Sequence, residues 1–254
     1  MSDNKSNILD RLKDFNDKLF KFWQCNNESF LSCGRLNISQ MIELKHNVHD
    51  VNNIITLLVT YLFIKELNDQ YKFTNTLNIN DIENKPNANG YDFIYPIGKR
   101  LIVAEVKCNL PCGNKKHNTY GADQIKGIIK DLSGLVKLKD KAQKQISKDD
   151  FNNAYKFLVV LEDEARNTQN AIRDLKDKIK RPSYTSNGVQ DLRRDLTEAN
   201  MTIDDILQED YYNEPNNPPR PTNTIYVVYI TPKDNLISEL LDEKNNECNI
   251  SAQL

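Results

Sequence analysis

The chain has 254 residues and a formal net charge of −2, and 39% of its residues are hydrophobic. This length suits one large hydrophobic core, and the near-neutral total excludes a polyanion-binding protein that is basic throughout. The charge is uneven, because residues 115–148 carry nine lysines and three aspartates, which leaves −8 for the rest of the chain.

The five cysteines are odd in number and irregularly spaced, and Met1–Lys5 lacks the apolar stretch of a secretory signal. We therefore expect a reduced, cytoplasmic protein. The longest apolar stretch, Ile54–Leu67, is interrupted by polar residues and is too short to span a bilayer, so no membrane segment is expected.

The first part of the chain is predicted to be largely helical. Apolar residues recur near helical spacing within residues 1–30 and again in Val51–Leu67, where Asp50 can cap the helix. A short helix is expected around Met41–His46, and a strand at Tyr71–Ile79. We expect the longer helix to pack on a sheet through its apolar face.

The second part of the chain is predicted to alternate strands and helices. Four short apolar or aromatic segments are predicted to be strands: Tyr91–Tyr95, Leu101–Cys108, Ala154–Leu161 and Thr224–Thr231. A helix is expected over Tyr120–Lys144, and two charged helices over Asp163–Leu207, broken at Arg181–Ser183. This order predicts an α/β fold with one mixed central β-sheet flanked by helices.

Two charged residues interrupt the predicted strand Leu101–Cys108. Side chains two apart on a strand share a face, so Glu105 and Lys107 project together. Charged side chains are rarely buried unless they are paired or bind a metal. The alternative is an exposed edge strand with a solvated Glu105–Lys107 pair, which the apolar Val103 and Leu101 on the same face disfavour.

A hairpin would bring a second carboxylate to this strand. If Gly98-Lys99 is a two-residue type II′ loop, Ile97 pairs with Arg100 and Asp92 lies opposite Glu105. The Cα atoms of such a non-hydrogen-bonded pair are about 4.5 Å apart. Like charges directly opposite are destabilising, and a divalent cation between them reverses the sign of that interaction. Oxygen ligands suit Mg²⁺ or Mn²⁺, so the pattern predicts a metal site at Asp92 and Glu105.

Asp92, twelve intervening residues and then Glu105-Val106-Lys107 resemble the PD-(D/E)XK nuclease superfamily, which includes type II restriction endonucleases. The resemblance implies that Asp92 and Glu105 bind the metal and that Lys107 is the catalytic lysine. It also implies a restriction-endonuclease-like core over residues 50–161 and 224–231. Residues 1–49 would then be an N-terminal helical extension and residues 162–223 a mostly helical insertion, all within one nuclease domain, 1–254.

The chain departs from the pattern of this superfamily in two places. Tyr91 stands where the family name has proline. Many members also place an acidic residue on the helix before the first strand, and here Asp50 and Glu43 are the preferred candidates for an additional metal ligand, ahead of Glu66. The helicase-linked branch, which has Gln followed four residues later by Tyr, is not supported, because Gln124 is followed by Ile128.

The locally basic region follows the strand that carries Glu105. Its candidate DNA contacts are Lys115, Lys116, Gln124, Lys126 and Lys130, because neutralised phosphates dominate affinity for DNA. A solvated helix face explains the same lysines equally well. His46 and His49 could share a helix face, but no further zinc ligand follows at a recognisable interval.

These patterns predict a Mg²⁺-dependent endonuclease that hydrolyses DNA phosphodiester bonds, with Mn²⁺ as a substitute. A restriction or phage-defence role on double-stranded DNA is expected, and symmetric cleavage would need a homodimer. The alternatives are a structure-selective nuclease of recombination or repair, and a non-catalytic nucleic-acid-binding protein that keeps the nuclease core.

Overall fold

The computed structural model describes residues 13–24, 44, 51–71, 90–97, 100–111, 119–163, 166–186, 188–209 and 224–232. The chain divides into two compact units, Met1–Leu58 with Lys233–Leu254, and Val59–Pro232. The prediction of a single nuclease domain, with its inner boundaries, remains a prediction.

The described part of the first unit is helical. Residues 13–24 form a helix within the predicted stretch 1–30. Helix α3 (Val51–Tyr71) begins in this unit and ends in the second, which confirms the helix predicted from Val51. The predicted short helix around Met41–His46 is described only at Leu44, which is helical, and the predicted strand at Tyr71–Ile79 lies outside the described residues beyond the end of α3.

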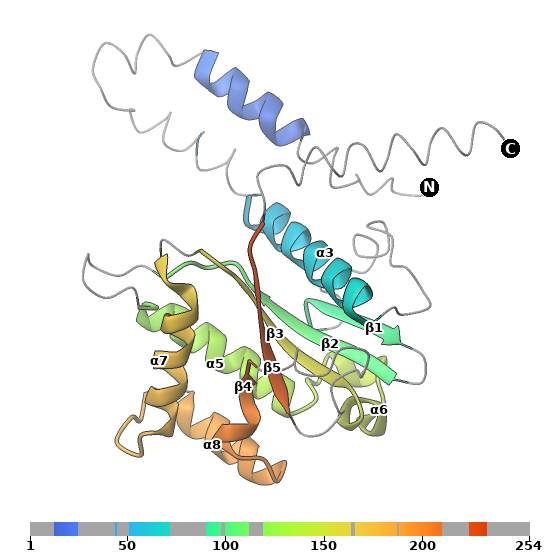
Figure 1. Ribbon diagram of the computed structural model, residues 1–254, viewed down its shortest axis with the longest axis vertical. Helices are drawn as coiled ribbons and strands as arrows, with labels where there is room; N and C mark the ends of the chain where they lie inside the picture. The colour runs from blue at the N-terminus through green and yellow to red at the C-terminus, as the bar shows by residue number, and fades with distance from the viewer. Residues whose placement is uncertain are drawn as a thin grey trace, which may run out of the picture. The chain divides into compact units, whose positions relative to one another are not determined.

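The second unit is built on a mixed five-stranded sheet, which confirms the predicted α/β class (Figure 1). Its strands are β1 (Phe93–Ile97), β2 (Arg100–Lys107), β3 (Tyr155–Leu161), β4 (Ile206–Gln208) and β5 (Ile225–Ile230). They lie in the order β1-β2-β3-β5-β4, with β1 antiparallel to β2 and every other neighbouring pair parallel. Four of the five strands fall where the sequence predicts them.

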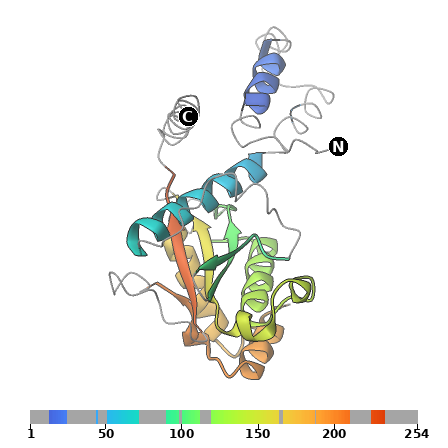
Figure 2. The same ribbon diagram turned by 90° about the vertical axis from the view of Figure 1, so that its right-hand side faces the viewer.

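Helices cover both faces of this sheet, as the two perpendicular views show (Figures 1 and 2). Besides α3, the helices are α5 (Ala122–Val136), α6 (Lys148–Asn152), α7 (Thr168–Lys180) and α8 (Val189–Glu198), with 3-10 turns at Ala142–Lys144 and Ile203–Asp205. On the α5 side, Leu158 and Val160 of β3 join the buried side chains of α5, α7 and α8 in one hydrophobic core. On the opposite face, the ring of Phe63 on α3 packs edge-on against Phe157, with centroids 5.2 Å apart.

The prediction of one helix over Tyr120–Lys144 is wrong in its last part, because α5 ends at Val136. The backbone oxygen of Gly134 would accept the N–H of residue 138 in a longer helix. It instead accepts a hydrogen bond from the Tyr91 hydroxyl at 2.7 Å, and the same hydroxyl accepts the Lys139 N–H at 3.0 Å. A side chain from the hairpin thus stops the helix, which periodicity within α5 cannot reveal.

The predicted break between the two charged helices is confirmed. Helix α7 ends at Lys180, and Arg181 is extended, with φ −74° and ψ 118°. The cause is Pro182, because the residue before a proline is disfavoured in helical geometry. Across the described ranges, no helix combines the length and hydropathy needed to cross a membrane.

Candidate functional site

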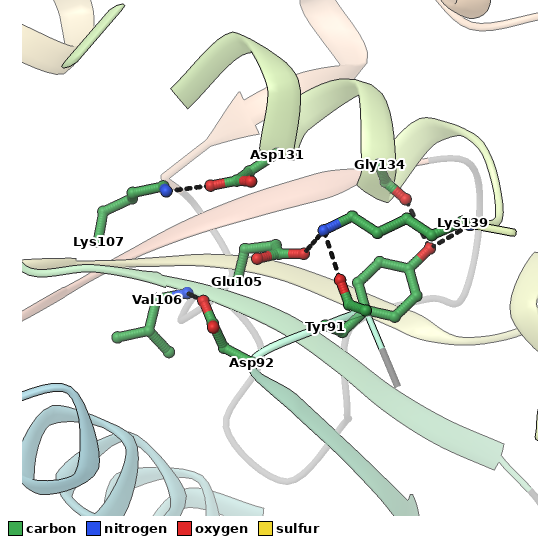
Figure 3. Close-up of polar contacts among 9 residues, drawn as sticks. Tyr91, Asp92, Glu105, Val106, Lys107, Asp131, Gly134 and Lys139 are labelled. Carbon is green, nitrogen blue, oxygen red and sulfur yellow. Dashed lines mark hydrogen bonds and ion pairs between the residues drawn. The ribbon is translucent and has the colours of Figure 1, made fainter. Parts of the chain in front are cut away.

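The hairpin has the predicted register. The cross-strand pairs run from Phe93 with Ala104 to Ile97 with Arg100, so the residue numbers of each pair sum to 197, as the two-residue loop requires. Asp92 directly precedes β1, and its carboxylate accepts a hydrogen bond of 2.8 Å from the N–H of Val106 (Figure 3). Asp92 is therefore tied to the backbone between Glu105 and Lys107.

Glu105 is buried, with 3% of its surface exposed, in the middle of the sheet. Its strand β2 has β1 on one side and β3 on the other, where Glu105 pairs with Leu158. The alternative of an exposed edge strand with a solvated pair is therefore wrong. The Glu105 carboxylate forms an ion pair with Lys139, which follows α5 in the chain.

Lys107 lies on the same face of β2 and is held by a different partner. Its ammonium group forms an ion pair with Asp131 on α5, and neither side chain is more than one-fifth exposed (Figure 3). Both charges of the Glu105-Val106-Lys107 sequence thus point toward α5, as the period-two geometry of a strand requires. They lie near the carboxyl end of β2, the end at which open α/β sheets commonly bind ligands.

The acidic groups act on one another electrostatically. Burial raises the pKa of Glu105 well above its usual value, and the nearby carboxylates of Asp131 and Asp92 raise it further, while Lys139 lowers it. Burial lowers the pKa of Lys107, but Asp131, Asp92 and Glu105 outweigh this and leave it raised. The structure therefore brings Asp92, Glu105 and Lys107 together in one electrostatically interacting cluster that contains one further acid, Asp131.

Lys139 reaches Glu105 by packing closely against Gly90, Tyr91 and Gly134. Its ammonium group donates to the backbone oxygen of Gly90 at 2.6 Å and lies 4.8 Å from the centre of the Tyr91 ring. Gly90 has φ +86°, a conformation that favours glycine. At Gly134 a Cβ would overlap Cε of Lys139, so the absence of a side chain there lets Lys139 reach Glu105.

Asp131, Lys139 and Tyr91 contact the candidate site but were not among the residues predicted from the sequence. Asp131 carried a usable signal, because it lies three residues after Ile128 and four before Leu135 on the apolar face of α5. A charge on that stripe demands a partner inside the protein. Lys139 carried no such signal, since it follows the end of α5 and its partner is 34 residues away in the chain.

The predicted DNA contacts differ in whether their side chains are engaged within the protein or exposed. Gln124 uses its side chain within the protein, where the amide donates to Leu110 O at 2.9 Å and accepts from Gly121 N at 2.8 Å. Lys126 and Lys130 are exposed on α5. Lys115 and Lys116 lie outside the described residues, as do the additional candidate metal ligands Asp50 and Glu43.

The donor set is compatible with a hard divalent cation, with few protein ligands. In the described part of the chain, no three His, Cys, Asp or Glu side chains gather closely enough to hold a metal ion. Mg²⁺ commonly takes one or two carboxylates and keeps several waters, so Asp92 and Glu105 suffice in kind. A cation there would relieve the repulsion that raises the pKa of Glu105.

Comparisons with protein-family models, with curated proteins and with solved structures find no match to this chain. The function must therefore be argued from the cluster itself.

Proposed function

We propose that this chain is a Mg²⁺-dependent endodeoxyribonuclease of the PD-(D/E)XK type, acting on double-stranded DNA in restriction or phage defence. The observation that carries the proposal is the buried Glu105 carboxylate. It shares its strand face with Lys107 and is acted on by Asp92, the three residue types that the superfamily pattern requires.

Each residue has a role that follows from its position. Asp92 and Glu105 would hold Mg²⁺, which when bound supplies charge neutralisation at the scissile phosphate and a more acidic bound water. Lys107 is kept cationic and oriented by its ion pair with Asp131. We therefore assign Lys107 to stabilising negative charge that develops on the phosphate, rather than to removing a proton from water.

Lys139 must compete with the metal in this scheme. Its ammonium group already neutralises the Glu105 carboxylate, and both cations would use the same oxygen atoms. Lys139 would therefore have to leave Glu105 before Mg²⁺ is bound there. The free energy of metal binding would then be less favourable by the free energy of that ion pair.

The proposal is tested by incubating the purified chain with supercoiled plasmid DNA, with Mg²⁺ or with EDTA. We expect Mg²⁺-dependent cleavage into discrete fragments, and a loss on the order of 10²-fold or more in rate for Asp92→Asn, Glu105→Gln and Lys107→Met. Asp123→Asn, at an exposed acid of α5, is the matched control and should cleave as the wild type does. Wild-type rates in all three cluster variants would refute the assignment.

Cleavage of both strands at one place calls for two active sites, so we propose a homodimer on DNA. Sedimentation velocity with a short duplex should give two chains per duplex. A single chain per duplex, together with nicking of one strand only, would contradict the dimer.

One observation favours a second candidate, a non-catalytic nucleic-acid-binding protein. Lys139 and Asp131 already pair with Glu105 and Lys107, so no metal is needed to neutralise these two charges. This candidate predicts DNA binding with no cleavage at any Mg²⁺ or Mn²⁺ concentration.

A further inference from the structure

A cavity of about 710 Å³ lies on the α5 side of the sheet. It is lined by the end of α5 and the chain after it, by the segment from the Ala142–Lys144 turn through α6, and by the end of α8. Val136, Ile146 and Phe151 give it apolar walls, and Gln143, Ser147 and Asn152 give it neutral polar groups. Small-molecule sites commonly have this size and this mixture of surfaces.

Lys156 of β3 lines this cavity and is 2% exposed. Its ammonium nitrogen lies 4.1 Å from the centre of the Phe151 ring, and within the described ranges it makes no hydrogen bond or ion pair. Burial lowers the pKa of Lys156 to about 8. A buried cation without a counter-ion is costly, and buried charges are normally paired.

The carboxylates in the cavity wall are engaged elsewhere. Asp195 accepts a hydrogen bond from the Ser133 hydroxyl, and Glu198 forms an ion pair with Lys137 at 3.5 Å. Of the remaining lining lysines, Lys148 is exposed. Lys156 is therefore a buried cation that no described carboxylate pairs with, and the described partner of the buried Asp195 carboxylate in the same wall is a hydroxyl rather than a cation.

The cavity is separate from the Asp92–Glu105–Lys107 cluster, none of whose members lines it. Lys156 pairs with Val103, whereas Lys107 pairs with Val160 near the other end of β3. Along β3, Lys156 lies two residues from the level of Glu105, which pairs with Leu158, and four residues from the level of Lys107, roughly 7 and 13 Å.

We propose that this cavity binds a small organic monocarboxylate, whose carboxylate pairs with Lys156 and whose apolar body lies against Phe151 and the neighbouring walls. A monoanion matches the charge of Lys156, whereas a phosphate dianion would leave excess negative charge in a cavity whose wall also contains the Asp195 carboxylate. An apolar body matches Val136 and Ile146, and the neutral side chains can satisfy the remaining carboxylate lone pairs.

The probe for this proposal is 4-iodobenzoate, titrated into the full chain by isothermal calorimetry. We expect saturable binding of one molecule per chain. Affinity should fall about tenfold or more in Lys156→Met, because the ion pair is lost. Lys144→Met removes an exposed lysine of the same segment that does not line the cavity, and should bind as the wild type does. Neutral 4-iodobenzyl alcohol should bind correspondingly more weakly.

Crystals soaked in 4-iodobenzoate provide a measurement that does not depend on any variant. An anomalous iodine peak inside the cavity, with the carboxylate beside Lys156, is the expected result. Absence of binding to the wild type, equal binding by a folded Lys156→Met, or displacement of the probe by inorganic phosphate at comparable concentration would each overturn the proposal.

Discussion

At the residue scale, the two charges on β2 are neutralised by residues distant in the chain. Glu105 is paired with Lys139, and Lys107 with Asp131. The two charges on β2 could be predicted from the sequence, because a strand's period of two fixes which residues share a face. Their partners could not, because a partner is chosen by tertiary packing, and only Asp131 stood out on its own helix.

The burial of Lys156 leads to a prediction of how the stability of the chain depends on pH. Its pKa is lowered to about 8 in the folded chain from 10.5, so the charged form is disfavoured by folding. Well below pH 8 the folded chain bears the full free-energy cost of burying the charged amine. This cost decreases as pH rises toward 10.5, because the folded chain then carries the neutral amine. Lys156→Met should therefore raise the free energy of unfolding by up to about 3 kcal/mol at pH 7, and the gain should vanish near pH 10.5.

Urea denaturation at several pH values measures this difference. Lys144→Met, at an exposed lysine, should change stability little at any pH. A Lys156→Met variant that is less stable than the wild type at pH 7, or whose gain is the same at every pH, would contradict the prediction.

The ion pair of Lys139 with Glu105 leads to a second prediction, on the stability of variants that lack one or both partners. Lys139→Met leaves a carboxylate that is 3% exposed without its cation, and removal of one partner of a buried pair costs on the order of 3 kcal/mol. The double variant Lys139→Met/Glu105→Gln should regain most of this loss, because the charge is gone as well. Denaturation of the four chains of the double-mutant cycle tests it, and additive effects would rule the coupling out.

At the element scale, the strands could be predicted well and the helix ends poorly. Strands β2, β3 and β5 are apolar because helices cover both faces of the sheet, so their composition identifies them. Strand β4 has only three residues, Ile206–Gln208, which is too short for a pattern. Helix α5 ends where Tyr91 takes its backbone hydrogen bonds, and that contact spans more than forty residues of chain.

Tyr91→Phe tests this account of the end of α5. Loss of the hydroxyl leaves the buried Gly134 oxygen without its donor, which should cost about 1–3 kcal/mol. Hydrogen exchange of the Lys139 amide, which loses its acceptor, should be faster than in the wild type. Tyr184→Phe, at a half-buried tyrosine packed against the core, is the control, and equal exchange of Lys139 in the two variants would exclude the proposed role.

At the scale of the whole molecule, the sheet of the second unit carries two charged sites on one face. The Asp92–Glu105–Lys107 cluster lies toward the carboxyl end of β2, and the Lys156 cavity lies toward the start of β3. The segment after α5 contributes to both, because Leu138 lines the cavity and Lys139 reaches Glu105. The sequence could predict the fold class and the face that Glu105 and Lys107 share, whereas the cavity depends on packing between α5, α6 and α8.

Titration of Mn²⁺ into the metal-free chain by calorimetry tests the central claim most directly. The account predicts binding at Asp92 and Glu105 that is lost in Glu105→Gln and in Asp92→Asn. Affinity should rise in Lys139→Met, which removes the competing cation, and in Gly134→Ala, whose added Cβ displaces Lys139. No binding to the wild type, or undiminished binding to Glu105→Gln, would contradict it.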